Sequence, residues 1–183
     1  MKSSIMLILL FFIACNTTDL ETTMNEQLYT YDVEKRIKEL KIELPLTTKP
    51  VANYLHAVKT GNLVFMAGKG PRTSDGTLVA GKIGIDLTVE QGYEAAKLVA
   101  IAQLSALKEQ IGDLNNVVQI VKVLGMVNAG PEFTDHPEVI NGFSDVMVEV
   151  FGERGKHARA AVGMASLPRN IACEIEMIVQ VKD

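Results

Sequence analysis

Tryptophan is absent from this chain of 183 residues, and aromatic residues make up only 5% of it. Few side chains are therefore available on which unpaired nucleic-acid bases could stack. Basic residues are also in the minority, because 18 Lys and Arg stand against 22 Asp and Glu and give a net charge of −4. No basic stripe of the kind that follows phosphates is present. Nucleic acid is accordingly not expected as a partner.

Cysteine is nearly as scarce, with Cys15 and Cys173 as the two examples. Cys15 is assigned to a lipid anchor and only Cys173 is left in the globular part, so no intrachain disulfide is expected and the fold depends on its apolar core. A content of 48% hydrophobic and 22% charged residues suits one globular domain at this length. The three histidines show no metal-ligand spacing, so no metal is expected; they are His56, His136 and His157.

The N-terminal residues have the pattern of a bacterial lipoprotein signal. Lys2 precedes an apolar run over residues 5–14, which is too short to span a bilayer but fits the hydrophobic region of a signal peptide. A small residue directly before Cys15 resembles a lipobox, in which this cysteine is lipidated and becomes the mature N-terminus. The sequence predicts a signal peptide over residues 1–14, a polar tether over 15–30 and one domain over 31–183.

Removal of the leader would take Lys2 with it and leave 17 basic against 22 acidic residues, a net charge of 17 − 22 = −5. Electrostatics would not hold such a domain on an anionic membrane, so attachment is expected through lipid alone. The expected location is the bacterial cell envelope. The alternative is translation from Met24, which would make the protein cytoplasmic.

Hydrophobic periodicity after the tether predicts an α+β domain. A short helix is predicted over residues 31–40, capped by Asp32, and two longer helices run from Thr88 to Gly112 and from about Pro137 to Gly152. Strands are predicted on either side of the Gly61-Asn62 turn and over three further segments. These segments are Val117–Val127, Ala158–Ala165 and Ile171–Val181, of which the last two are expected to pair.

Two main helices can cover only one face of the resulting mixed sheet. The strand over Leu63–Ala67 is apolar throughout and is expected to be buried on both faces. Association between subunits is the simplest way to cover the second face, so an oligomer is predicted.

Two side chains near the C-terminus could carry chemistry. Strand alternation places Arg159 on one face with Ala161, and Glu174 on a polar face of the last strand. If these strands pair, the guanidinium and the carboxylate share one pocket, where arginine could hold a carboxylate and glutamate could activate water. A structural salt bridge is the alternative interpretation of the same spacing. Ser144 and Ser166 have no evident base nearby in the sequence, so serine nucleophile chemistry is not predicted.

The segment Gly155–Pro168, together with Glu174-Ile175-Glu176, resembles the signature of the RidA/YjgF family. Tyr54 and the segment Gly61–Gly68 are similar to the family's N-terminal hairpin. The resemblance covers about residues 45–183 and marks a divergent subgroup with an additional N-terminal helix.

This resemblance implies a chorismate-mutase-like fold that forms a homotrimer, with three sites in the clefts between subunits. It also implies cofactor-free hydrolysis of 2-imino acids and their enamine tautomers to 2-keto acids and ammonia. Arg159 would hold the substrate carboxylate, and Glu174 would position the attacking water. Tyr54, Gly68 and Ala161 would line the cleft.

Three positions depart from the family pattern. His157 stands where proline is common, Ala161 where cysteine is common, and Lys69 where glutamine is common. The substitutions at Ala161 and Lys69 keep a second hypothesis open, in which the protein binds small carboxylates without turnover.

Overall fold

The computed structural model describes residues 28–47, 50 and 52–183. The predicted signal peptide, Cys15, Met24 and residues 15–27 of the predicted tether lie outside the described residues. Within the described part of the chain, no helix is both long and apolar enough to cross a membrane.

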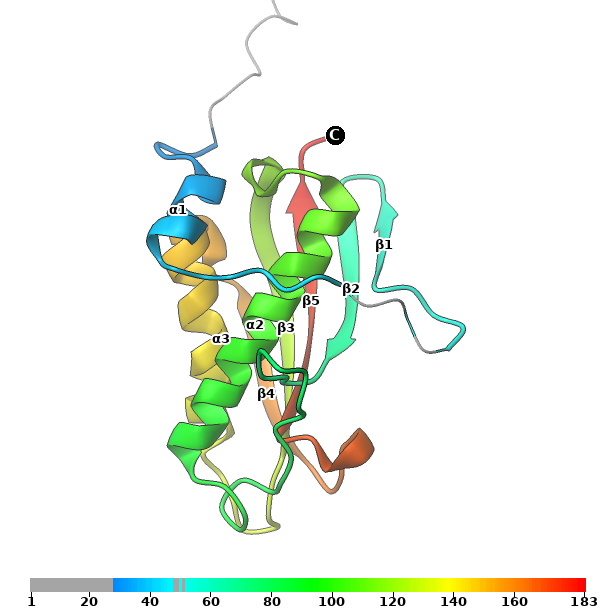
Figure 1. Ribbon diagram of the computed structural model, residues 1–183, viewed down its shortest axis with the longest axis vertical. Helices are drawn as coiled ribbons and strands as arrows, with labels where there is room; N and C mark the ends of the chain where they lie inside the picture. Colours follow the sequence, from blue (N-terminus) through cyan, green and yellow to red (C-terminus); the bar gives the residue numbers. More distant parts are fainter. Residues whose placement is uncertain (1–27, 48–49, 51) are drawn as a thin grey trace, which may run out of the picture.

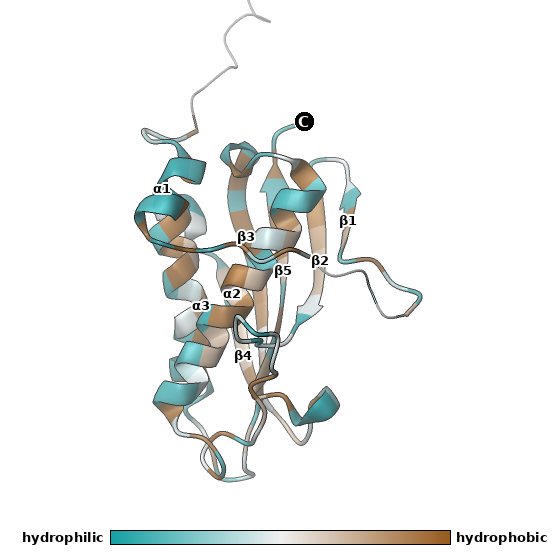
Figure 2. Ribbon diagram, in the orientation of Figure 1, coloured by the Kyte–Doolittle hydropathy of each residue, from teal (hydrophilic) through white to brown (hydrophobic). Residues whose placement is uncertain are grey.

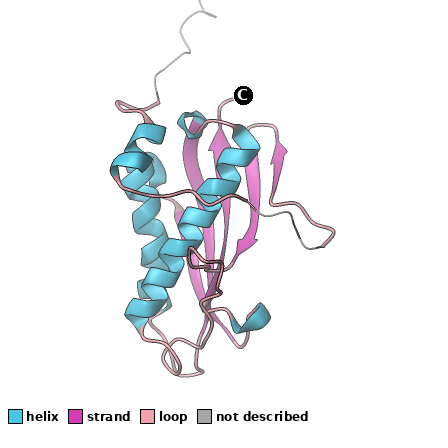
Figure 3. Ribbon diagram, in the orientation of Figure 1, coloured by secondary structure: helices cyan, strands magenta, loops and turns pink. Residues whose placement is uncertain are grey.

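The described elements form one α+β domain in which helices and strands lie in separate layers (Figures 1 and 3). Three short 3-10 helices, η2, η3 and η4, cover Leu114–Asn116, Gly152–Gly155 and Pro168–Asn170. In chain order the other elements are α1 (Val33–Glu39), β1 (Ala57–Thr60), β2 (Leu63–Lys69), α2 (Val89–Ile111), β3 (Val117–Asn128), α3 (His136–Phe151), β4 (Ala158–Met164) and β5 (Cys173–Val181).

The predicted helix boundaries are confirmed because local capping chemistry sets them. The hydroxyl of Thr88 accepts from the Gln91 backbone N–H at 3.2 Å, and the Gln91 side chain accepts from the Thr88 backbone N–H at 2.9 Å. Asp32 caps α1 through a 2.8 Å bond from the Lys35 backbone N–H. Gly152 follows α3 with a positive φ of 59°, a conformation that glycine adopts without strain.

The sheet has the strand order β1-β2-β5-β3-β4, so the predicted pairing of the last two strands is wrong. β3 lies between β4 and β5 and pairs with both, parallel to β4 and antiparallel to β5. β4 is parallel to β3 because the chain crosses from one to the other through α3.

The chain between the last two strands does not form a hairpin. It passes through η4, where Arg169 and Asn170 have positive φ values of 56° and 57°. An isolated bridge between Ala80 and Ile171 then holds it away from β4, and a 3.0 Å bond from the Ala172 N–H to the Val79 carbonyl extends this contact. These bonds to residues 79–80 direct the chain into the middle of the sheet.

The core lies between the sheet and the α2–α3 pair, which cover the same face (Figure 1). Hydrophobic residues run along both helices and along the strands behind them (Figure 2). The helices approach closely at Gly142, where an added Cβ would overlap the backbone carbonyl of Tyr93. Glycine is therefore required at this contact, because any side chain would push the two helices apart.

The opposite face of the sheet, here called the open face, is apolar and uncovered in a single chain. Val58 and Phe65 face each other across the β1–β2 pair and are 52% and 43% exposed, and Val162 on β4 is 40% exposed. Val64 and Met66, which point toward the helices, are buried. Within one chain, the predicted strand Leu63–Ala67 is therefore buried on one face, and its other face is the one for which the sequence predicts cover by a second subunit.

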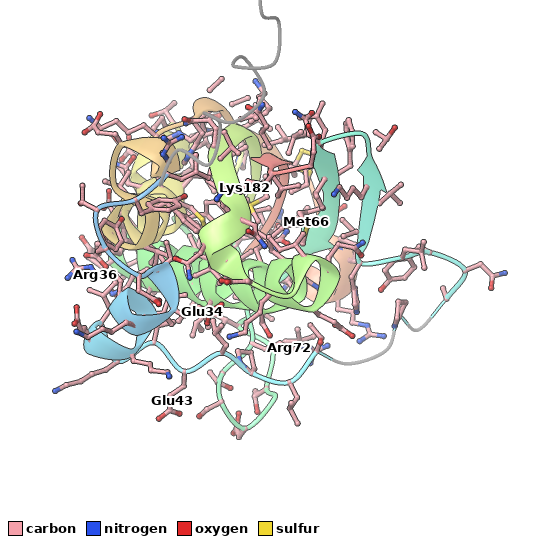
Figure 4. The ribbon with its side chains drawn as sticks, turned by 90° about the horizontal axis from the view of Figure 1, so that it is seen from above. Glu34, Arg36, Glu43, Met66, Arg72 and Lys182 are labelled. Carbon is pink, nitrogen blue, oxygen red and sulfur yellow. The ribbon has the colours of Figure 1, made fainter. Side chains whose placement is uncertain are left out.

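The N-terminal segment that includes α1 packs against the rest of the domain. Tyr29 lies within the predicted tether, yet it is 7% exposed, and its hydroxyl donates to the Val117 carbonyl at 2.6 Å. Glu34 forms an ion pair with Lys108 at the end of α2. Viewed from above, Glu34 points toward the body of the domain, whereas Glu43 points away from it (Figure 4).

Candidate functional site

Arg159 lies on the edge strand β4 and points toward α3. Its Nη1 donates to Asn141 Oδ1 at 2.9 Å and to Ser144 Oγ at 3.0 Å. These two bonds use both hydrogens of Nη1. Nε and Nη2 make no hydrogen bond with the described residues, and together they form the side edge of the guanidinium. One edge of Arg159 is thus held by the protein, and the other can bind a carboxylate through two parallel bonds.

Ser144 is itself held by His157, a contact that the sequence did not reveal. The hydroxyl oxygen lies 3.0 Å from His157 Nε2, and His157 Nδ1 lies 2.6 Å from the Gly155 carbonyl oxygen. The expectation that Ser144 has no base nearby is therefore wrong for the folded chain. A serine in α3 and a histidine 13 residues later meet only because β4 returns alongside the helix.

The hydrogen bonds fix the tautomer of His157. A carbonyl oxygen can only accept, so Nδ1 carries the hydrogen and Nε2 of the neutral ring accepts from the Ser144 hydroxyl. Burial, and to a smaller extent the nearby Arg159 charge, lower the pKa of His157 below its usual value. The ring is therefore neutral at pH 7, as this arrangement requires.

Glu174 lies on the central strand β5 and points to the open face. Burial raises the pKa of its carboxyl group, and the neighbouring Glu176 adds to the effect. A Cβ at Gly68 would overlap Glu174 Oε1, so the carboxylate lies directly across the glycine. A carboxyl with a raised pKa binds protons more readily than an ordinary glutamate and is suited to act as a general base.

Gln103 on α2 supports this part of the site and was missed from the sequence. It is fully buried, and its Nε2 donates to the carbonyls of Ala67 at 2.9 Å and Ile175 at 2.8 Å. These carbonyls flank Gly68 and Glu174, where the β2–β5 register shifts. The amide therefore holds the two strands together at the irregularity. The sequence contains one signal of this role, because Gln103 is a polar residue among the apolar, core-facing positions of α2.

The remaining predicted residues divide between the two edges of the sheet. Ala161 lies on β4 with Arg159 and packs partly against the core. Tyr54 precedes β1 at the opposite edge of the sheet and is 47% exposed. Its ring lies edge-on to the ring of His56, with the two ring centroids 6.2 Å apart. Tyr54 and Ala161 therefore do not meet within one chain.

Arg159 and Glu174 are also apart in a single chain. Arg159 pairs with Val123 and Glu174 with Met126, on opposite sides of β3 and on opposite faces of the sheet. Two strand spacings and three residues along the strand separate their Cα atoms by roughly 14 Å. The described residues contain no ion pair between Arg159 and Glu174, so a structural salt bridge between them is excluded within the chain.

The site residues therefore form two half-sites. The arginine half-site contains Arg159, Ala161, Asn141, Ser144 and His157. The glutamate half-site contains Glu174 and Gly68, and Tyr54 precedes β1 at the edge of the sheet far from Arg159. Two hollows of about 350 and 590 Å³ lie elsewhere on the surface, and neither includes a residue of the half-sites.

Comparison with known proteins assigns the fold to a family. The family described as "YjgF/chorismate_mutase-like, putative endoribonuclease" matches residues 34–181. The chain belongs to this family. Its five-stranded mixed sheet and helices form the chorismate-mutase-like fold of RidA proteins.

Individual relatives agree with this assignment. The chain is 37% identical to the protein TCP17 of Trypanosoma cruzi, over 82% of its own length and 95% of that protein. It is 30% identical to a 2-iminobutanoate/2-iminopropanoate deaminase of Dermatophagoides farinae, over 77% of its length and 95% of that protein. A crystal structure of a protein of unknown function from Agrobacterium tumefaciens has 41% identity and a TM-score of 0.75, covering 82% of this chain and 94% of that one.

Proposed function

We propose that this RidA/YjgF protein hydrolyses 2-imino acids and their enamine tautomers to 2-keto acids and ammonia, without a cofactor. The observation that carries the proposal is the state of Arg159, whose Nη1 is fully used by Asn141 and Ser144 while its other edge can take a carboxylate. The deaminase from Dermatophagoides farinae supports the choice of reaction.

The chemistry divides between the two half-sites. Nε and Nη2 of Arg159 bind the carboxylate of the imino acid and so fix the position of the neighbouring C=N carbon. Glu174 accepts a proton from water as the water oxygen bonds to that carbon, and the raised pKa of this carboxyl favours the transfer. Glu174 returns this proton to the nitrogen of the tetrahedral adduct, and the hydroxyl proton of the adduct follows by the same route as the C–N bond breaks. Ammonia is released, and the carbonyl group of the 2-keto acid forms.

The two half-sites can act together only if they belong to different subunits. We propose a homotrimer in which the open face of one subunit lies against the arginine half-site of a neighbour. The exposure of Val58, Phe65 and Val162 on the open face supports this arrangement. Each Å² of apolar surface that is buried between subunits would stabilise the assembly by about 25 cal/mol.

Substitutions at Arg159 and Glu174 separate binding from catalysis. Arg159→Lys keeps the charge but loses the planar fork, so affinity for 2-ketobutyrate should fall by about 1.5–3 kcal/mol, the usual value of a charge-assisted hydrogen bond. Glu174→Gln keeps the shape but cannot accept the proton, so binding should persist while turnover falls. Calorimetry with 2-ketobutyrate and ammonia release from freshly generated 2-iminobutyrate measure the two quantities.

The outcomes distinguish the hypotheses. Wild-type protein that binds 2-ketobutyrate but releases ammonia no faster than buffer would favour the non-catalytic carboxylate binder. Unchanged affinity in Arg159→Lys would remove the arginine from the site and contradict the proposal.

We also propose that the mature chain is attached to the bacterial cell envelope through lipid on Cys15. The apolar run over residues 5–14 and the small residue before Cys15 support this. Cell fractionation followed by an intact-mass measurement tests it. A soluble cytosolic chain that begins at Met24 without lipid would contradict the anchor and leave the proposed chemistry unaffected.

A further inference from the structure

The bonds around Arg159 form a single directed chain. Arg159 Nη1 donates to Ser144 Oγ at 3.0 Å, and this hydroxyl donates to His157 Nε2 at 3.0 Å. His157 Nδ1 then donates to the Gly155 carbonyl at 2.6 Å. Each hydrogen bond in this chain can run in only one direction from donor to acceptor, because the guanidinium at one end only donates and the carbonyl at the other end only accepts.

The far end of this chain is fixed in the core. Gly155 is buried, and an added Cβ there would overlap the Met147 carbonyl, so the backbone of η3 lies directly on α3. The His157 ring meets Phe143 edge-on at a centroid distance of 6.4 Å. The histidine is thus held by a rigid carbonyl and a buried aromatic ring, and its Nε2 presents a fixed acceptor to Ser144.

We infer that Ser144 and His157 are positioning residues for the carboxylate-binding edge of Arg159. The inference rests on the proposed function. With Nη1 anchored to Ser144 and to Asn141, the guanidinium plane is set before substrate arrives, and less side-chain freedom is lost on binding. Neither Ser144 nor His157 needs to touch the substrate for this role.

Two substitutions of His157 isolate the contact with Ser144. His157→Gln can place an amide oxygen near the position of Nε2 and so keep an acceptor for Ser144. His157→Asn can keep an amide donor near the position of Nδ1 for the Gly155 carbonyl, but it does not reach Ser144. Ser144→Ala removes the middle of the chain, and Ser166→Ala on the exposed loop after β4 is the matched control.

We expect Ser144→Ala and His157→Asn each to raise the dissociation constant of 2-ketobutyrate roughly 3- to 10-fold, the effect of losing about one hydrogen bond. KM should rise with little change in kcat, since the bond orders a group that binds substrate and transition state alike. His157→Gln should restore affinity to within about 2-fold, and Ser166→Ala should change nothing. For the amide of 2-ketobutyrate, which lacks the carboxylate, the differences should disappear.

The double variant Ser144→Ala with His157→Asn gives a sharper test. Both changes break the same chain, so the double variant should bind no more weakly than Ser144→Ala alone. Additive losses would show two unrelated structural roles and overturn the inference. Ring ¹⁵N shifts of the wild-type protein provide a measurement without mutation, because the inference requires His157 to carry its hydrogen on Nδ1, and the opposite tautomer would refute it.

Failure of this inference is distinguishable from failure of the proposed function. If Arg159→Lys weakens 2-ketobutyrate binding while Ser144→Ala and His157→Asn do not, Arg159 binds the carboxylate but the chain does not position it. If wild-type protein binds no 2-ketobutyrate, both fail together.

Discussion

Subunit mixing tests whether Arg159 and Glu174 of different subunits form one site. The perturbation is a pair of variants, Arg159→Lys and Glu174→Gln, each of which should have little activity as a homotrimer when the substrate concentration is far below the KM of the wild-type protein. The two variants are unfolded together in equal amounts and refolded, so that subunits assort at random.

The expected magnitude follows from the geometry of the half-sites. When a site takes its arginine from one subunit and its glutamate from the next, half of the arginine half-sites and half of the glutamate half-sites are intact. The mixture should therefore recover about one quarter of wild-type activity per site. If both residues came from the same subunit, the mixture would recover none.

A second mixture provides the control. Wild-type chains mixed equally with the double variant, Arg159→Lys with Glu174→Gln, should show about one quarter of wild-type activity for a site between subunits and about one half for a site within one. Ammonia release from 2-iminobutyrate is the assay, with each variant refolded alone to set the baseline. Recovery near zero in the first mixture together with one half in the second would refute the shared site.

Two glycines give further predictions. Gly68→Ala places a methyl group against the Glu174 carboxylate. We expect kcat to fall at least 10-fold while the melting temperature changes little. An unchanged kcat would show that the position of the carboxylate is unimportant. Gly142→Ala forces α3 away from the Tyr93 carbonyl on α2, so overpacking should cost about 2–3 kcal/mol and lower Tm by roughly 5–10 °C. Glu149→Ala, a substitution at an exposed position of the same helix, is the control for Gly142→Ala. Equal melting temperatures for these two variants would contradict the predicted overpacking.

Local features of the fold could be predicted from the sequence because neighbouring residues determine them. The capping pair at the start of α2 lies three residues apart, and Gly152 ends α3 by itself. The hairpin at Gly61-Asn62 also depends on one turn. Each of these elements was placed within a few residues of its observed bounds.

Strand order could not be predicted in the same way. The last two strands are joined by only eight residues, which favours a hairpin, but bonds from the connection to residues 79–80 insert β5 beside β2. The contact between Ser144 and His157 could not be predicted for the same reason, because the end of α3 and η3 lie between the two residues in the chain. Period-two alternation gave the correct face for Arg159 on its strand, but only strand order shows which element that face meets.

The open face leads to a last prediction, which separates folding from assembly. Phe65 is 43% exposed in the single chain and faces away from the core, so Phe65→Glu places a charge where a folded monomer already meets water. Folding of the monomer should therefore tolerate it, whereas an apolar interface would have to desolvate the charge.

Light scattering at micromolar concentration should show a trimer for the wild-type protein and a monomer for Phe65→Glu, with far-UV circular dichroism unchanged. Deaminase activity should be lost with the trimer, although Arg159 and Glu174 are both intact, because each subunit then carries two half-sites that cannot meet. Lys59→Glu on the neighbouring exposed edge strand is the control and should leave both assembly and activity in place. A monomeric Phe65→Glu variant with full activity would show that one chain suffices, and the division of the site between subunits would have to be abandoned.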